Sequence, residues 1–239
     1  MQPASDFDRT ASNVAIWHDF DSAVKAELYS TCLATSGGTY FIDPIPLKTG
    51  PLFELIGSNS VAGIVVTNGN HHRASVRFAD QFSVPIFAHL DTFAGAEARG
   101  ARPSILALGC GERSSATPNE LLGGRNSGGL QAVQRRSVAD GDEIFEGLRA
   151  IGIEGAVEGE IALHYAPDGG TFIIGDALIN FEPYGFTFLP AKYCSNQEQM
   201  RRSLRKLLDY KAERMFFAHG TPILSEAGER LRGLIDSAL

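Results

Sequence analysis

The sequence contains only three cysteines, and no two of them are spaced as Cys-x-x-Cys. Cys32, Cys110 and Cys194 are far apart, which argues against a disulfide framework and against a thiolate metal site. No apolar stretch approaches the length that a bilayer requires, and the segment from Met1 to Thr10 lacks the apolar core of a signal peptide. These absences predict a soluble, cytoplasmic protein with reduced thiols.

Positive charge is also scarce, since 21 Lys and Arg against 28 Asp and Glu give a formal net charge of −7. A surface for nucleic acid or for an anionic membrane needs clustered basic residues. The one basic run, residues 201–206, alternates with apolar residues as an amphipathic helix does. The glycine spacing of a Rossmann loop or a P-loop is missing, as is Gly-x-Ser-x-Gly. We therefore expect no nucleic-acid partner, no membrane partner and no nucleotide cofactor.

The apolar content is sufficient for a full core, because 44% of the 239 residues are hydrophobic. No shift in composition divides the chain, so we expect one domain over residues 1–239. Periodicity predicts strands and helices in an order typical of layered α/β domains, with a capping box at Ser195 opening the third helix. The expected strands are 14–20, 28–34, 39–42, 62–66, 84–89, 144–148, 149–153, 161–165, 171–174 and 215–218, and the expected helices are 51–56, 74–82, 195–210 and one from about 225.

Residues 95–129 differ in character from the rest of the chain. They are rich in Gly, Ser, Arg and Pro and show little sustained periodicity. Long irregular segments are often functional covers or binding loops. We predict a lid or an oligomer contact here, with a plain irregular excursion as the alternative, and the sequence leaves a homodimer open.

The segment that follows the apolar run 62–66 is the most informative part of the chain. The pattern predicts a buried strand, then a polar loop, then the N-terminus of an amphipathic helix. Free backbone N–H groups at a helix N-terminus can bind a ligand, so such junctions often carry functional sites. The loop reads Thr67-Asn68-Gly69-Asn70-His71-His72-Arg73.

This loop resembles the Thr-His-x-His-x-Asp-His motif of the metallo-β-lactamase superfamily, whose side chains hold one or two zinc ions. Thr67 is retained. Asn68 and Asn70 stand at the first two His positions, His72 at the Asp position and Arg73 at the last His position.

Later landmarks of that superfamily follow in the same order. Ile42-Asp43 matches a pair near the site, and Glu154 to Leu163 matches Pro-Gly-His-Thr-Pro-Gly-Ser-x-x-Leu, with Ala156 at the position of the ligating His. Gly175-Asp176 matches the family's bridging Asp, and His219-Gly220-Thr221-Pro222 matches its terminal His motif. The resemblance implies an α/β (α+β) fold, the four-layer αββα sandwich, with five metal ligands replaced and two retained.

The replaced residues imply that the ordinary two-metal chemistry is lost. Asparagine is a weak zinc ligand beside imidazole, and a guanidinium cannot ligate. We therefore expect a metal-free protein whose polar pocket binds a small anionic ligand or a partner. The expected pocket residues are Asn68, Asn70, His71, His72, Arg73, Asp176 and His219.

Two further hypotheses stay open. In one, His72, Asp176 and His219 hold a single zinc, manganese or iron ion, and the protein is a hydrolase of an ester, thioester or phosphoester. In the other, the enzyme needs no metal, and His72 or His219 acts as general base beside Arg73. In the metal-free readings, Arg73 is expected to replace the lost cation through a bidentate pair with Asp176. His71, although counted with the pocket, could instead face solvent.

Overall fold

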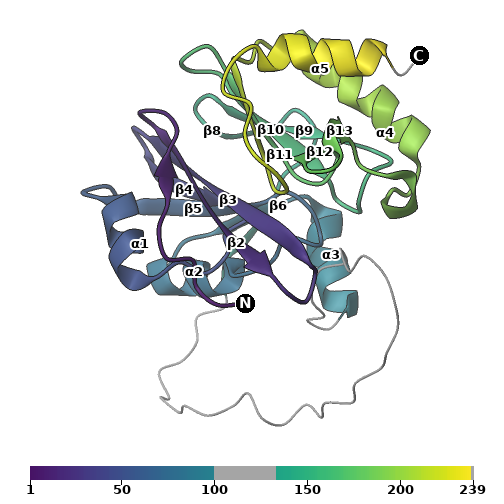
Figure 1. Ribbon diagram of the computed structural model, residues 1–239. Coiled ribbons are helices and arrows are strands. Elements are labelled where there is room, and N and C mark those ends of the chain that lie inside the picture. The colour runs from purple at the N-terminus through teal and green to yellow at the C-terminus, as the bar shows by residue number, and fades with distance from the viewer. Residues whose placement is uncertain (100–132, 238–239) are drawn as a thin grey trace.

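The computed structural model describes residues 1–99 and 133–237. Figure 1 shows two stacked sheets with helices α1 to α3 on the outer side of one and α4 and α5 on the outer side of the other. This four-layer αββα arrangement is the fold that the sequence predicts.

The first sheet has seven strands in chain order, β1 to β7. Neighbouring strands from β1 to β4 pair antiparallel, whereas those from β4 to β7 pair parallel, with one helix between β4 and β5 and one between β5 and β6. Its strands are β1 (Asp8–Arg9), β2 (Val14–Asp21), β3 (Ala26–Thr35), β4 (Gly38–Ile42), β5 (Val61–Val66), β6 (Ile86–Ala88) and β7 (Arg135–Ser137). Its helices are α1 (Thr49–Ile56), α2 (Ser75–Phe82) and α3 (Leu90–Arg99).

The second sheet has five strands in the order β14-β11-β10-β9-β8, and a separate hairpin, β12–β13, follows β11 in the chain. Strands β11 and β14 pair in parallel, so their carboxyl ends meet at one edge. The strands are β8 (Glu143–Phe145), β9 (Leu148–Gly152), β10 (Ile161–Tyr165), β11 (Thr171–Ile174), β12 (Leu178–Phe181), β13 (Gly185–Phe188) and β14 (Arg214–Phe217). The helices are η1 (Ala191–Tyr193), α4 (Gln197–Leu204), η2 (Arg205–Asp209) and α5 (Ala227–Asp236), where η marks a 3₁₀ helix.

Three apolar clusters fill the spaces between the four layers. One lies between the first sheet and its helices around Phe41 and Phe78, and one lies between the second sheet and its helices around Met200 and Leu231. The third joins the inner faces of the two sheets. Burial on both faces explains why the central strands have long apolar runs rather than simple alternation.

Several expected boundaries were wrong. Residues 95–99, assigned to the irregular segment, continue helix α3, and residues 100–129 of that segment lie outside the described part of the chain. The helix expected over 195–210 divides into α4 and η2, and its N-cap is Asn196 rather than Ser195, since the Asn196 side chain accepts from the Gln199 N–H. Strands β1 and β7, helix α3 and the β12–β13 hairpin were not predicted.

Candidate metal centre

The site lies where strands of both sheets end. Strands β4 and β5 run parallel in the first sheet and lead into Asp43 and the loop 67–73. Strands β11 and β14 run parallel in the second sheet and lead into Asp176 and His219. The docking of the two sheets therefore brings polar side chains from four distant segments together.

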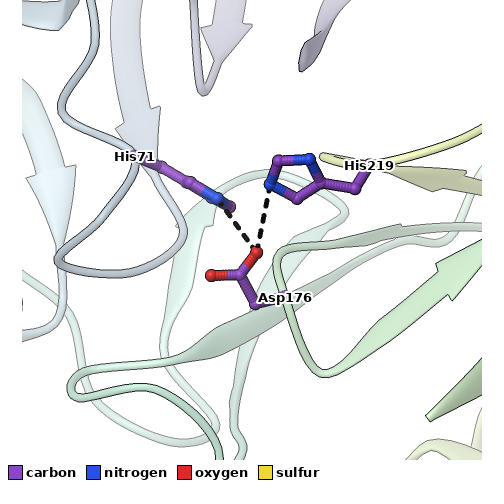
Figure 2. Close-up of side chains that lie close together, drawn as sticks. All are labelled: His71, Asp176 and His219. Carbon is purple, nitrogen blue, oxygen red and sulfur yellow. Dashed lines mark ion pairs between the residues drawn. The ribbon is translucent and has the colours of Figure 1, made fainter. Parts of the chain in front are cut away.

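Three side chains converge at the centre of this site: His71, Asp176 and His219 (Figure 2). The Asp176 Oδ1 atom lies 3.2 Å from His71 Nε2 and 3.3 Å from His219 Nε2. All three side chains are at most 3% exposed. Their ligand atoms all lie within 4.8 Å of one another, a distance that one cation can bridge.

Second partners fix the orientation of both imidazole rings. His71 Nδ1 lies 3.0 Å from the carboxylate of Asp43, and His219 Nδ1 lies 3.2 Å from the carbonyl oxygen of Glu27. Because a carbonyl oxygen and a carboxylate oxygen only accept, each Nδ1 is assigned the proton. In a neutral ring, the Nε2 atom that faces Asp176 therefore presents a lone pair.

The contacts of Asp176 Oδ1 with the two imidazoles are within ion-pair distance when a ring carries a second proton. Within the part of the chain that the structure describes, neither Asp176 Oδ1 nor His71 Nε2 has a hydrogen-bond partner, and both atoms are buried. Buried polar atoms without partners are costly and rare. Lone pairs of two rings and one carboxylate that meet in one place require a cation or additional protons.

The other carboxylate oxygen of Asp176 has a different environment. Its Oδ2 accepts from the side-chain amide of Asn68 at 3.1 Å and from that of Asn70 at 3.5 Å. The Asn68 amide also donates to Glu160 Oε2 at 2.6 Å. Glu160 Oε1 in turn accepts from the backbone N–H groups of Asp176 and Ala177.

The charges of the cluster shift the pKa values of its members. Burial alone would lower the pKa of His71, but the charges of Asp176 and Asp43 outweigh it, against the effect of Arg73, and raise it to about 9. Burial and the charge of Asp176 raise the pKa of Glu160 to about 8. Burial also lowers the pKa of His219. Although burial opposes it, the charge of His71 holds the pKa of Asp176 well below its usual value.

Two of the expected site residues, His72 and Arg73, contact backbone carbonyls outside the three-residue cluster. His72 Nε2 lies 3.1 Å from the carbonyl oxygen of Thr92, so the structure places His71, not His72, beside Asp176 and His219. Arg73 donates to the carbonyl oxygens of Tyr29, Asp43 and Ala218. The expected bidentate pair between Arg73 and Asp176 is not among the ion pairs of the described residues. With its guanidinium held by carbonyls, Arg73 is also not placed as an oxyanion clamp.

A pocket of about 300 Å³ opens beside the cluster and reaches Asp176 and Asn70. Ala156, at the position of a family metal ligand, forms part of its wall instead of a histidine. The remaining wall is Val157, Glu158, Leu189, Lys192, Tyr193, Cys194 and Ser195. Of the seven residues expected to line the polar pocket, only Asn70 and Asp176 do so. Because His71 and His219 do not line it, a ligand in the pocket would approach the cluster from the Asp176 side.

Sequence reasoning missed Glu160 and the pocket wall after β13. Glu160 stands at the Ser position of the matched stretch 154–163, but Glu154 and Glu158 lie in the same stretch, so its charge alone did not single it out. The order of His71 and His72 could not be decided from spacing. The loop turns irregularly, and Arg73 has φ 36°, in the left-handed region.

The comparisons with known proteins agree with this architecture. No family model matches the sequence, and no curated protein matches it. Among solved structures, the fold is similar to that of VMB-1 (TM-score 0.69, 12% identity, 100% of this chain and 99% of that chain). It is also similar to the DIM-1 metallo-beta-lactamase (0.67, 11%, 98% and 97%) and to a metallo-beta-lactamase family protein from Thermus thermophilus (0.61, 19%, 96% and 79%).

The chain therefore has the metallo-β-lactamase fold, as the sequence motifs predict. The likeness extends over the whole length of the chain, although at these identities it defines the fold alone. Among the described residues, no helix is both long enough and apolar enough to cross a bilayer.

Proposed function

We propose that the protein is a mononuclear metal-dependent hydrolase in which His71, Asp176 and His219 hold one divalent ion. The single observation that supports this most directly is the convergence of His71 Nε2 and Asp176 Oδ1, two buried atoms without hydrogen-bond partners among the described residues. A divalent cation would satisfy both atoms and His219 Nε2 together.

Protons alone satisfy the cluster less well. One proton on His71 Nε2 offsets the repulsion with Asp176, and the raised pKa of His71 favours it. The His219 ring would still direct a lone pair at the same carboxylate oxygen, 3.3 Å away, because burial lowers its pKa and its Nδ1 holds the proton. A metal ion removes both repulsions at once.

The spacing and the surroundings of the three side chains also fit a metal. Zinc bonds to nitrogen and oxygen of about 2.0–2.1 Å at tetrahedral angles separate two ligand atoms by about 3.3 Å. The two distances at Asp176 Oδ1, 3.2 and 3.3 Å, match this value. Metal-binding histidines usually donate their other ring N–H to a carboxylate or a carbonyl. Asp43 and the Glu27 carbonyl fill those two roles here.

The donor set favours zinc, manganese or iron, since two imidazoles and one carboxylate suit each of them. A metal held in this way lowers the pKa of water and polarises a carbonyl or phosphoryl oxygen. The pocket beside Asp176 would admit the substrate, with the Asn70 amide close to the reacting end and the Lys192 ammonium able to neutralise an anionic group. We infer a small anionic ester, thioester or phosphoester as the substrate class.

A second candidate is a metal-free binding protein that uses the same pocket. It is favoured by the position of His71 between Asp43 and Asp176, 3.0 and 3.2 Å away, where an imidazolium would pair with both carboxylates. In that case, the pocket would hold its anionic ligand or partner without any catalytic ion.

Metal content separates the two candidates, and adjacent histidines provide a matched control. Untagged protein would be incubated with zinc, manganese or iron, desalted and analysed by plasma mass spectrometry. We expect about one ion per chain in the wild type and in His72→Ala, and none in His71→Ala, with folding of each variant checked by circular dichroism. Absence of metal under every condition, or equal loss in both variants, would exclude the mononuclear site and leave the metal-free candidate.

A further inference from the structure

We infer that the Asn68–Glu160 pair takes the place of a second metal ion and limits this site to one. The inference rests on the proposed function and concerns the oxygen of Asp176 that the ion does not use. In the metallo-β-lactamase motif that Gly175-Asp176 resembles, the aspartate bridges two metals. Here Asp176 Oδ1 faces His71 and His219, whereas Asp176 Oδ2 accepts from the side-chain amide of Asn68.

Asn68 is fully buried, and all of its side-chain polar atoms are used. Its Nδ2 donates to Asp176 Oδ2 at 3.1 Å and to Glu160 Oε2 at 2.6 Å, while its Oδ1 accepts from the Asn70 backbone N–H at 2.8 Å. One amide therefore separates two buried carboxyl groups and donates to both. An amide placed there supplies to Asp176 Oδ2 the positive field that a cation would otherwise supply.

Glu160 fixes the other side of the same unit. Its Oε1 accepts from the backbone N–H groups of Asp176 and Ala177 at 2.8 and 2.9 Å. These bonds hold the main chain that bears Asp176, while Asn68 holds its side chain. Together they aim Asp176 Oδ1 at the two histidines, which makes Asn68 and Glu160 positioning residues.

The space around this unit is closed to larger groups. A Cβ atom added at Gly175 would lie 2.6 Å from Thr67 Oγ1, 2.7 Å from Glu160 Oε1 and 3.1 Å from Asn68 Nδ2. Real Cβ atoms essentially never approach a neighbour closer than 3.0 Å, as the first two contacts would require. Asn68 and Glu160 are thus tightly packed next to Asp176, the ligand that they orient. Ala156, which stands at another replaced ligand position, instead lines the pocket.

The test begins with the metal stoichiometry of the wild-type protein and needs no variant. Zinc would be titrated into chelator-treated protein in competition with a chromophoric chelator. One ion per chain supports the inference, and two ions would overturn it while leaving a metal-dependent function standing. No ion at all would remove the proposed function itself, and the inference with it.

The second step tests positioning with Asn68→Leu, which keeps the approximate size of the side chain but removes its donors. We expect zinc affinity to fall about 10- to 100-fold, as for other residues that orient metal ligands. The visible absorption of the cobalt-substituted protein should also change, because Asp176 is no longer held in one orientation. A folded Asn68→Leu protein with the wild-type affinity and cobalt spectrum would overturn the inference.

Glu160→Gln serves as the second variant, because it preserves shape and can keep the two backbone hydrogen bonds through Oε1. Its amide would then face the Asn68 amide, donor against donor, and the same loss of affinity is expected. Glu154→Gln is the matched control, since that carboxylate bonds to Lys206 and Ser203. Equal zinc affinity in Glu160→Gln and Glu154→Gln would contradict a positioning role for Glu160.

Discussion

Replacement of Arg73 by methionine should strongly destabilise the protein, because this side chain joins the two sheets at the site. Its guanidinium donates to the carbonyl oxygens of Tyr29 and Asp43 in the first half, at 2.6 and 3.1 Å. It also approaches the carbonyl oxygen of Ala218 in the second half, at 3.4 Å. Methionine would fill similar space but donate to none of them, and the carbonyls of Asp43 and Ala218 would keep only their bonds from Ser30 Oγ and the Tyr29 N–H.

The expected loss follows from the number of bonds and from the burial of the group. Removing one member of a buried, charged hydrogen-bond network costs about 3–5 kcal/mol. Arg73 as a residue retains some exposed surface, although its Nε is buried, so we expect the lower end, about 3 kcal/mol. For a domain of this size, that loss corresponds to a fall in Tm of roughly 6–12 °C.

Urea unfolding of chelator-treated protein, followed by circular dichroism, would measure this change without a contribution from metal. Arg73→Lys provides the control, because it retains the charge but cannot reach three carbonyls with a planar fork. It should fall between the wild type and Arg73→Met. A loss below about 1 kcal/mol in Arg73→Met would refute the conclusion that this residue joins the halves.

Two further predictions concern the charge and the packing of the site. In chelator-treated protein, stability should fall from pH 6 to pH 9. The pKa of His71 is raised from 6.5 to about 9. Its contribution to the free energy of unfolding, on the order of 3 kcal/mol, is therefore complete below pH 6.5 and is lost as the pH rises through 9. The pKa of Glu160 is raised from 4.5 to about 8, so its ionisation also lowers stability as the pH rises. Urea midpoints at both pH values would measure the fall, and a flat or rising profile would contradict the pairing of His71 with Asp43 and Asp176. Gly175→Ala should cost about 1–3 kcal/mol through overpacking against Thr67 and Glu160. Gly50→Ala, at a position in α1 where an added Cβ meets nothing within 4 Å, should be neutral or slightly stabilising in thermal melts of the two variants, and equal effects of the two changes would contradict the packing argument.

The fold was predictable because its signals are local and ordered. Apolar runs and turn residues located most strands of both sheets, and spaced motifs such as Gly175-Asp176 and His219-Gly220 placed them in one architecture. Short edge elements escaped detection. Strand β7 has three exposed residues, so it lacks the apolar pattern that marks a buried strand.

The site was predictable only in part, for reasons of geometry. Asp176 and His219 follow directly from buried strands, so their place at the sheet edge could be inferred from position alone. His71 lies in an irregular loop, where a change of one residue decides which side chain faces inward. Glu160 acquires its role through contacts with Asn68 and Asp176, residues 92 and 16 positions away in sequence, which no local pattern encodes.

The division of the cluster between two sheets has a consequence for folding. His71 belongs to the first half of the chain, whereas Asp176 and His219 belong to the second, so no unfolded or half-folded chain presents all three. An ion that binds only the docked state stabilises the native protein by about 1.4 kcal/mol for each tenfold excess of the free ion over its Kd. The concentration of free ion would then set part of the stability of the docked state, independently of any reaction at the site.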